Sequence, residues 1–489
     1  MDPPNNMTCS VKDLLVGWAS RNITPDRPVA LSGQFYVRIS KGVLDPITAT
    51  ALSIEGVDKH GDKEQAIMVS CDLVGIRRGI QDLVREKAHP KLTGFDTKKL
   101  FLNATHTHTA PVMVEGEYPP QDASVMTPTE YADFLTDRIA ETAVEAWMNR
   151  QPGGISRAFS HAVVGHNRRT HYFDGTSQMY GKTNRDDFDC IEGYEDHSLD
   201  ILFTWDNKKD LTGIIINIAC PSQVTEGLDQ ISADYWHEVR VELRKKYGEQ
   251  LFVLPQCSAA GDQSPHFLLY AREEEVMRRR KSVSEREEIA HRIANAVDSE
   301  YHLADKEIQK QVTFQHVVRD LDVPARIVTE AEAARAREYY EAWKNKEIDK
   351  NTSEYSLFRR SESVMKRYEA QKEELSWSIE IHILRLGDIV IATNPFELFL
   401  DYGLRIKARS QALQTFIVQL ASGYYGYLPT KRAVAAGGYG AEAASNNVGP
   451  EGGQELVEQT VKLINEMWND GTEPISKLPD YVTQHTVKS

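Results

Sequence analysis

Hydrophobic residues fall in short blocks along this chain, and their spacing alternates between strand-like and helix-like segments. Residues 65–75 (QAIMVSCDLVG) and 100–108 are apolar runs that end in polar residues, which is typical of buried strands. Residues 129–149 place apolar side chains at helical spacing and predict an amphipathic helix. The first third of the chain therefore predicts strands and helices in alternation.

The middle of the chain predicts a hairpin, a helix and a further strand. Residues 154–190 are rich in Gly, Asn, Asp and Arg, and we expect them to be mostly loops. Two apolar runs, 198–206 and 211–220, flank a polar turn and predict antiparallel strands. Residues 234–248 then predict a helix, and residues 250–262 a buried strand.

The second half predicts charged helices followed by a return to strands. Residues 270–311 and 326–375 are rich in Glu, Lys, Arg and Ala, so we expect helices whose charges face solvent. Residues 377–394 and 416–430 predict strands, and residues 454–468 a closing helix. The order of these elements predicts an α/β (mixed α+β) fold with central mixed β-sheets flanked by helices.

Neither repeats nor a Pro/Ser-rich linker divide the sequence, so we expect residues 1–489 to form one domain.

The net charge of −15 argues against nucleic-acid binding and against docking on an anionic membrane. Apolar runs are too short for a transmembrane helix. The start of the chain, 1–6, has no signal-peptide pattern, so the protein is cytoplasmic as written, or periplasmic or secreted if a signal was removed.

Reactive side chains follow several predicted strands at the point where each strand ends. These residues are Asp72, His106, His108, Cys220, Asp262, Ser264, Glu397 and Tyr427. Strand ends at one edge of a sheet are where α/β enzymes commonly assemble their sites. Each residue also has a structural interpretation, and Asp262 fits a turn or a helix cap better than a catalytic role.

The two histidines of residues 101–111 (FLNATHTHTAP) are the strongest chemical signal in the chain. On an extended strand His106 and His108 would point to the same face. Such a pair can bind a divalent metal, or one ring can bind it while the other transfers protons. A surface loop that happens to contain two histidines is the alternative.

Several motifs, taken together and in order, resemble the N-terminal catalytic domain of the neutral/alkaline (non-lysosomal) ceramidase superfamily of zinc-dependent amidases. The family's THTHSGP resembles residues 105–111, its NRS resembles 167–169, its GDVSPN resembles 261–266, its PGEF resembles 395–398, and its GYVTT resembles 426–430, with Tyr439 following. A sixth segment lies near Asp72. The blocks extend over nearly the whole chain, and their common order is what makes the resemblance specific.

The resemblance implies a role for each matching residue. Zinc would be held by His106, Glu397 and Tyr427, with His108 transferring protons or stabilising an oxyanion beside it. The same resemblance implies that Arg168 and Tyr439 hold the substrate or the developing charge, and that Ser264 is an active-site serine. Without the resemblance, Glu397 could cap a helix after Pro395, and both tyrosines could be packing residues.

The sequence departs from the family where a second histidine ligand is expected, in a segment like NFAxHPT. Residues 217–223 read NIACPSQ, so Cys220 is the nearest replacement as a zinc ligand, or else a buried small residue. A plain helix histidine is the better interpretation of His237, which follows on the next predicted helix. We also expect the protein to be without the C-terminal immunoglobulin-like domain of ceramidases proper, which weakens the inference to ceramide.

These observations predict a metal-dependent, zinc-type hydrolase that cleaves an amide or ester bond of a small polar or amphiphilic substrate with metal-activated water. A metal-free carbohydrate-active enzyme, which would use His, Tyr and Arg on an acidic saccharide, is a second possibility. A non-catalytic ligand-binding protein is a third. Oligomeric state and substrate identity stay open, because a fold does not determine a substrate.

Overall fold

Two β-sheets packed face to face form the centre of the molecule, as seen in a computed structural model that describes residues 13–373 and 375–468. The larger sheet has eight strands in the order β14-β13-β12-β7-β1-β4-β5-β6. Its strands are β1 (Leu15–Asn22), β4 (Thr48–Val57), β5 (Lys63–Cys71), β6 (Leu100–Ala104), β7 (Gln151–His161), β12 (Ser198–Asp206), β13 (Leu211–Ile218) and β14 (Phe252–Cys257).

Most neighbours in the larger sheet are antiparallel, but one pair at each end is parallel. β5 pairs in parallel with β6, and β13 pairs in parallel with β14. Parallel neighbours end at the same edge, so the loops that follow each pair emerge together. The predicted strands at 65–75, 198–206, 211–220 and 250–262 are confirmed: β12 has the predicted range, and β5, β13 and β14 end earlier than predicted.

The smaller sheet has four strands in the order β16-β17-β18-β20. They are β16 (Phe314–Pro324), β17 (Ser376–Leu386), β18 (Ile389–Thr393) and β20 (Gln414–Val418). β18 and β20 are parallel, which gives the fold a third parallel pair. A shared core of large apolar side chains, including Phe101, Leu254, Leu384 and Phe416, fills the space between the two sheets.

One short segment after β20 connects both edges of the eight-stranded sheet. Gln419 donates its backbone N–H to Cys257 of β14 (3.0 Å), and Ser422 donates to Leu102 of β6 (3.0 Å). Between them, Ala104 of β6 donates to the carbonyl of Leu420 (3.2 Å). The large sheet therefore curves until its first and last strands lie close together, and the C-terminal part of the chain closes the gap.

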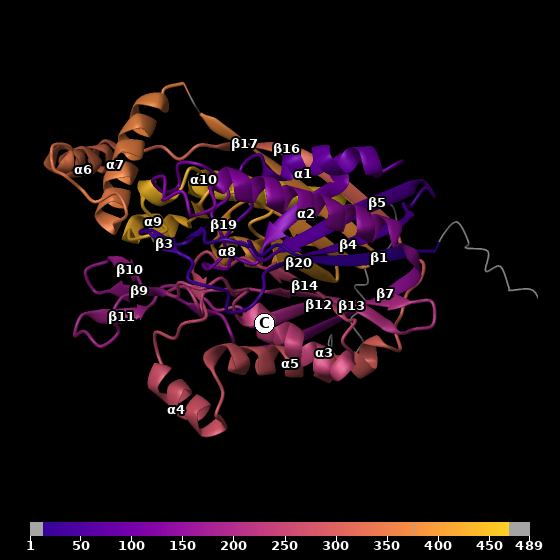
Figure 1. Cartoon of the computed structure of the whole chain (residues 1–489). Coiled ribbons are helices and arrows are strands. Elements are labelled where there is room, and N and C mark those ends of the chain that lie inside the picture. The colour runs from indigo at the N-terminus through magenta and orange to yellow at the C-terminus, as the bar shows by residue number, and fades with distance from the viewer. Residues whose placement is uncertain (1–12, 374, 469–489) are drawn as a thin grey trace, which may run out of the picture.

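Helices cover the outer faces of both sheets (Figure 1). α2 (Pro128–Met148) packs on β1 and β4, and a capping box between Thr127 and Glu130 fixes its start. α3 (Tyr235–Tyr247) packs against α5 (Glu285–Ala304), which lies on β7 and β12. α8 (Leu400–Arg409) and α10 (Pro450–Glu466) cover the smaller sheet. α1 (Ile80–Ala88) packs beside α2.

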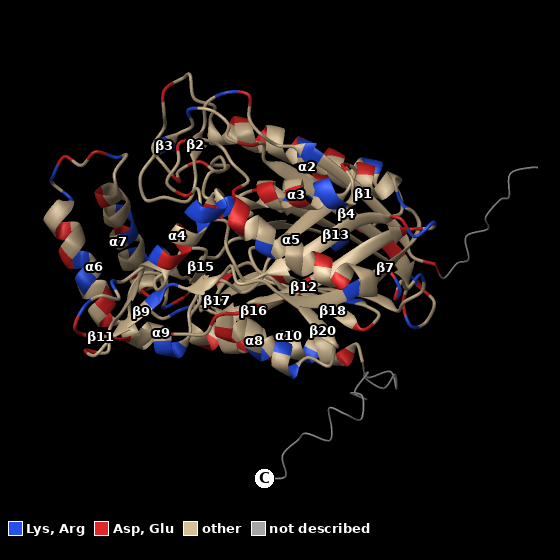
Figure 2. Cartoon of the chain, turned by 90° about the horizontal axis from the view of Figure 1, so that it is seen from below, with Lys and Arg blue, Asp and Glu red and all other residues tan. Residues whose placement is uncertain are grey.

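A helical pair, α6 (Glu330–Trp343) and α7 (Ser353–Ala370), stands at one end of the molecule (Figure 1). Acidic and basic residues both occur along α6 and α7 (Figure 2), as expected for helices with solvated faces. α4 (Ala271–Lys281) is another charged helix near the surface. The predicted helices at 129–149, 234–248 and 454–468, and those within 270–311 and 326–375, are confirmed.

The prediction of loops over residues 154–190 is wrong for its first part. β7 is an eleven-residue strand that begins at Gln151. Gly153 and Gly154 suggested a loop, but a Cβ on Gly153 would lie 2.5 Å from the carbonyl oxygen of Trp205 on the neighbouring strand. These glycines therefore allow close backbone approach within the sheet. The remainder forms loops and the short strands β8 (His166–Asn167), β9 (Arg169–Tyr172), β10 (Ser177–Met179) and β11 (Phe188–Ile191).

The described part of the chain has no helix long and apolar enough to cross a bilayer. Residues 1–6, on which the expectation about a signal peptide depended, lie outside the described residues.

Candidate functional site

The three parallel strand pairs deliver the loops of one buried polar site. Val74 follows β5 and His106 follows β6, while Gln223 follows β13. Glu397 belongs to β19 (Glu397–Leu398), which comes after β18, and pairs with β21 (Tyr427–Leu428), which comes after β20. The site is thus assembled from segments up to about 350 positions apart in sequence, at the place where both sheets meet.

His106 has a backbone and a ring orientation that its neighbours fix. β6 ends at Ala104, before the histidines, so the expected extended strand through residue 108 is wrong. Instead His106 adopts a left-handed conformation (φ 68°), and its N–H bonds to the carbonyl of Leu73 at 2.9 Å. Its Nδ1 lies 2.6 Å from the carbonyl oxygen of Val74, which makes Nδ1 the protonated nitrogen and leaves Nε2 facing the site.

Glu397 is a buried, ionised carboxylate opposite that nitrogen. Its Oε2 lies 3.4 Å from Nε2 of His106, and its Oε1 accepts a 2.6 Å hydrogen bond from the hydroxyl of Tyr424. Burial raises the pKa of Glu397, but the interaction with His106 and the hydrogen bonds from Tyr424 and Tyr427 outweigh burial and bring it to about 2. Glu397 does not cap a helix, because α8 begins only at Leu400.

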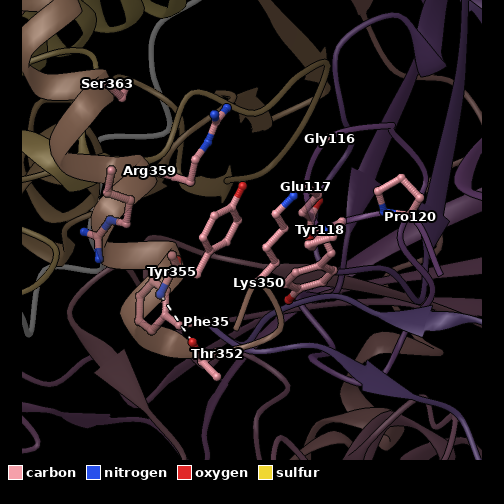
Figure 3. A pocket seen from close by; sticks show the side chains of 13 residues that line it. Phe35, Gly116, Glu117, Tyr118, Pro120, Lys350, Thr352, Tyr355, Arg359 and Ser363 are labelled. Atoms are coloured by element: carbon pink, nitrogen blue, oxygen red, sulfur yellow. Dashed lines mark hydrogen bonds between the residues drawn. The ribbon is translucent and has the colours of Figure 1, made fainter. Parts of the chain in front are cut away.

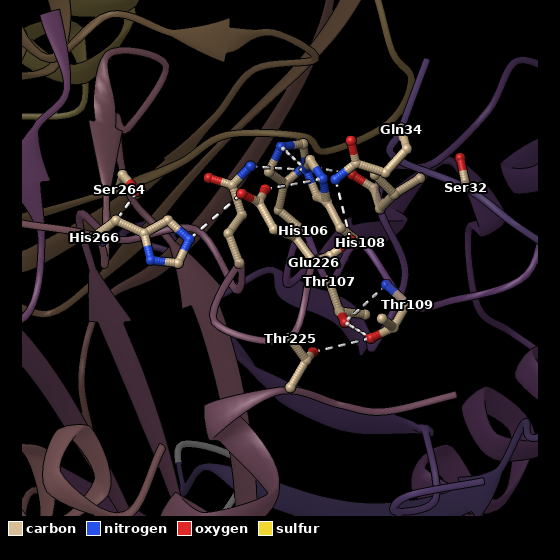
Figure 4. Close-up of polar contacts among 12 residues, drawn as sticks. Ser32, Gln34, His106, Thr107, His108, Thr109, Thr225, Glu226, Ser264 and His266 are labelled. Atoms are coloured by element: carbon tan, nitrogen blue, oxygen red, sulfur yellow. Dashed lines mark hydrogen bonds and ion pairs between the residues drawn. The ribbon is translucent and has the colours of Figure 1, made fainter. Parts of the chain in front are cut away.

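His108 lies directly beside His106 (Figure 4). The two Nε2 atoms are 3.3 Å apart, and the rings meet edge to face. The side-chain nitrogen of Gln223 lies 2.9 Å from Nε2 of His108, and Glu226 lies 3.6 Å from its Nδ1. Burial, reinforced by the neighbouring ring of His106, holds the pKa of His108 well below its usual value. His108 is therefore a neutral imidazole with a carboxylate behind it.

Arg168 is the buried cation of the site, with an exposed fraction of 2%. Its guanidinium donates to the phenol oxygen of Tyr427 (3.3 Å), to the side-chain oxygen of Gln223 (3.2 Å) and to the carbonyl of Gly261 (3.0 Å). Burial alone would lower the pKa of Arg168, but the phenols of Tyr180 and Tyr427 raise it, and the net pKa is well above its usual value. Its positive charge is therefore permanent.

Ser264 and Tyr439 lie on either side of this arginine. Ser264 accepts a 3.0 Å hydrogen bond from Tyr180, whose hydroxyl also accepts one from Arg168 at 3.0 Å. Tyr439 meets the ring of Tyr427 edge to face, with centroids 5.3 Å apart. Burial raises the pKa of Tyr439 to about 12. Tyr439 and Tyr427 are therefore neutral phenols at physiological pH.

Cys220 is the one predicted site residue that the structure places elsewhere. Its thiol points to the backbone oxygen of Val164 (3.4 Å), among apolar side chains that pack between the large sheet and α3. Burial raises the pKa of Cys220 well above its usual value, so the thiol stays protonated. This position favours the second interpretation given above, a buried small residue at a strand end.

Four residues that the sequence analysis did not assign contribute to the site: Gln223, Tyr424, Tyr180 and Glu226. Gln223 lies in the very segment that lacks the expected histidine, and Tyr424 lies in the tyrosine-rich stretch after β20. Their position within these segments is the one feature of the sequence that could have marked them as site residues. Tyr180 had none, because it reaches Arg168 from a loop whose conformation (φ 55°) no pattern predicts.

Two aspartates at predicted strand ends have structural roles instead. Asp262 accepts from the backbone N–H of Leu400 at the start of α8 (2.9 Å), as expected for a capping residue. Asp72 forms a buried, bidentate pair with Arg240 of α3, with both N–O distances at 2.9 Å. The pair attaches α3 to the end of β5.

The donor set for a metal is incomplete. Across the described residues, no three His, Cys, Asp or Glu side chains are arranged to hold an ion. One imidazole, one carboxylate and one phenol from the expected set do converge, through His106, Glu397 and Tyr427. Nε2 of His106 and the ionised carboxylate of Glu397 face each other at 3.4 Å, and imidazole nitrogen and carboxylate oxygen are both ligands that suit a divalent cation.

The three-dimensional arrangement matches two solved structures. Neutral ceramidase from Pseudomonas aeruginosa superposes with a TM-score of 0.67 and 18% identity, over 93% of this chain and 75% of that one. The chain has the neutral ceramidase fold. A ceramidase complexed with C2 gives a TM-score of 0.65 and 16% identity, over 92% of this chain and 74% of that chain.

Sequence comparison adds no relative to this picture. No protein-family model matches the chain, and no curated protein matches it significantly. The neutral ceramidase fold, which the ordered motifs predicted, is confirmed by structure, and so is its mixed α/β architecture. Activity has to be argued from the site itself.

Proposed function

We propose that this protein is a hydrolase that cleaves an amide bond, or less readily an ester bond, in a small polar or amphiphilic substrate. One observation carries the proposal: two adjacent imidazoles, an ionised buried carboxylate and a permanent buried cation converge on one point within the neutral ceramidase fold. Acyl transfer to water needs a proton acceptor and a stabiliser of negative charge, and both are present.

His108 is the group suited to move the proton. Its Nε2 carries the lone pair that faces His106 and Gln223, while its Nδ1 faces the carboxylate of Glu226. An imidazole oriented in this way can accept a proton from the attacking water and pass it to the leaving amine. Glu226 would stabilise the imidazolium that forms in between.

Arg168 is suited to hold the developing oxyanion. Its guanidinium contacts Tyr427 at 3.3 Å and is fixed by the carbonyl of Gly261, so this donor is held in position before the substrate binds. Preorganised donors in a dry site typically lower the barrier by several kcal/mol. Tyr439, which packs on Tyr427, would assist Arg168 or contact the substrate.

Zinc remains part of the proposal, with a smaller donor set than the resemblance implied. His106, Glu397 and Tyr427 are the side chains that would hold the ion, and Cys220 is left out because its thiol points into the core. A bound divalent ion would supply Lewis acidity toward the scissile carbonyl and its water.

The test is hydrolysis by purified protein of a panel of N-acyl amines and matched esters, before and after chelation and with zinc added back. We expect amide hydrolysis that His106→Ala and Glu397→Gln each reduce by at least about a hundredfold. Full activity in a metal-free preparation would reject the role of zinc. No turnover of any N-acyl substrate would reject the amidase itself.

The acidic-saccharide alternative is the one competitor that an observation favours. Histidine, tyrosine and arginine converge here without a complete metal site among the residues that the structure describes. Uronate-containing saccharides therefore belong in the same panel. Their cleavage or elimination, with N-acyl amines untouched, would replace the amidase by a carbohydrate-active enzyme.

A further inference from the structure

A cavity of about 460 Å³ lies between α7 and the segment around residues 116–120 (Figure 3). Aromatic side chains of Phe35, Tyr118 and Tyr355 line it, and so do the cationic side chains of Lys350, Arg359 and Arg360. In Figure 3 Lys350, Tyr118 and Tyr355 extend into the space between the helix and this segment. The cavity thus combines flat apolar walls with a concentration of positive charge.

This cavity adjoins a second one that borders the candidate active site. Phe35 and Arg360 also line a second cavity, of about 290 Å³, whose wall includes the site residues Tyr427 and Tyr439. The guanidinium of Arg360 lies 5.0 Å from the ring of Phe35 and 5.4 Å from that of Tyr439. Phe35 also packs edge to face on Tyr439, with centroids 5.2 Å apart, so Phe35, Arg360 and Tyr439 form the wall where the two cavities adjoin.

The charge of the cavity is positive although the whole chain carries −15. Its one acidic lining residue, Glu117, is already paired with Arg77 at 3.1 Å and accepts a hydrogen bond from Ser32. Arg360 is partly engaged by Glu442 (3.0 Å), and Arg359 by Glu362 (3.2 Å). Even so, three cationic side chains face one carboxylate whose charge Arg77 offsets, and a confined cationic surface attracts anions.

We propose that this cavity binds an anionic group, a carboxylate or a phosphate, carried by the substrate on the part remote from the scissile bond. The proposal rests on the proposed function and names its substrate class: N-acyl amines with an acidic terminus. Lys350, Arg359 and Arg360 would bind the anion, and the rings of Phe35, Tyr118 and Tyr355 would contact the linker. Guanidinium and ammonium groups suit this role because they donate charge-assisted hydrogen bonds to oxyanions.

The test compares matched probes that differ in one charge. N-octanoyl-glycine and N-octanoyl-6-aminohexanoate carry a carboxylate at two distances, their terminal amides are the neutral partners, and N-octanoyl-phosphoethanolamine carries a phosphate. Binding is measured by calorimetry on the His106→Ala protein, so that hydrolysis does not interfere. We expect at least one acidic probe to bind about tenfold more tightly than its neutral partner, with weaker preference as salt rises.

Variants then locate the preference. Lys350→Gln combined with Arg359→Gln should reduce the acidic-over-neutral ratio on the order of tenfold. Lys372→Gln just after α7, where the lysine is 74% exposed and paired with Glu369, is the matched control and should leave the ratio unchanged.

Each outcome has a separate consequence. Equal binding of acidic and neutral probes, or a preference that survives the double variant, overturns the cavity proposal. A preference that the double variant removes supports it, even where the active protein hydrolyses none of the probes. Failure of the active protein to hydrolyse any of the probes would reject only the amidase proposal, so the two proposals fail in distinguishable ways.

Discussion

Gln223 joins His108 to Arg168: its side-chain nitrogen lies 2.9 Å from Nε2 of His108, and its oxygen accepts from the guanidinium at 3.2 Å. A neutral amide thus stands between the proton carrier and the cation, in the segment where the resemblance led us to expect a histidine. The amide fixes the orientation of both groups without competing for the proton that His108 would carry.

Replacing Gln223 tests this orienting role. Gln223→Ala removes one hydrogen-bond partner from each of two buried groups, so we expect the free energy of unfolding to fall by about 1–3 kcal/mol. We also expect kcat/KM to fall at least about tenfold, because the imidazole loses its fixed position. Gln411→Ala, at an exposed position, is the control. Unchanged kinetics in Gln223→Ala would contradict the role.

Gly33 packs against the ring of His108, and its substitution tests the position of that ring. An added Cβ would lie 2.6 Å from Cγ of His108, at a residue with φ of +102°. We expect Gly33→Ala to lower kcat strongly, because the ring must move. Gly42→Ala is a close control, since Gly42 also has positive φ (+149°) but open space around it. Equal effects of the two variants on kcat would contradict the packing argument.

Substitution of Cys220 distinguishes the interpretation as a buried core residue from the interpretation as a metal ligand. Because its thiol points into the core, we expect Cys220→Ala to lower the free energy of unfolding by about 1–2 kcal/mol. Zinc content per chain, measured by mass spectrometry after dialysis, should not change, whereas His106→Ala should lose the ion. Loss of zinc from Cys220→Ala would show that the cysteine binds it.

Because of His266, we expect the free energy of unfolding to change with pH in the alkaline range. It lies between Glu226 (3.4 Å) and Glu285 (3.7 Å). Burial lowers its pKa, but hydrogen bonds to the two carboxylates outweigh burial and raise the pKa to about 10. Since the folded-state pKa exceeds the unfolded value of about 6.5, this stabilisation is complete below pH 6.5 and is lost as pH rises through about 10.

The measurement is the free energy of unfolding of wild type and His266→Gln between pH 6 and 10.5. We expect the difference between the two proteins to be largest near pH 6 and to shrink steadily above about pH 7. A difference that stays constant over this range would mean that His266 is not charged in the folded protein.

Regular elements could be predicted from the sequence because their apolar spacing is local. The helix at α2 and the strands β5, β12 and β13 are strongly patterned, and each lies close to its predicted range. β7 was missed because Gly153 and Gly154 signal a loop in sequence, and only the approach of a neighbouring backbone shows why they are needed.

The candidate site was only partly predictable. Ordered motifs pointed to His106, Glu397 and Arg168, which the structure brings together. Gln223 and the cavity beside α7 depend on loops and helices distant in sequence, and no spacing rule connects Phe35 to Arg360. The left-handed backbone of His106 likewise depends on contacts with residues 73–74.

Residues 419–422 join β6 to β14, the two outermost strands of the large sheet, and this has a consequence for biosynthesis. While a ribosome is still producing the chain, β6 and β14 are complete long before the segment that joins them exists. Until then β6 and β14 are edge strands with unpaired backbone N–H and C=O groups, and other nascent chains could pair with them. Premature termination before position 419 should therefore yield aggregates rather than a smaller folded protein.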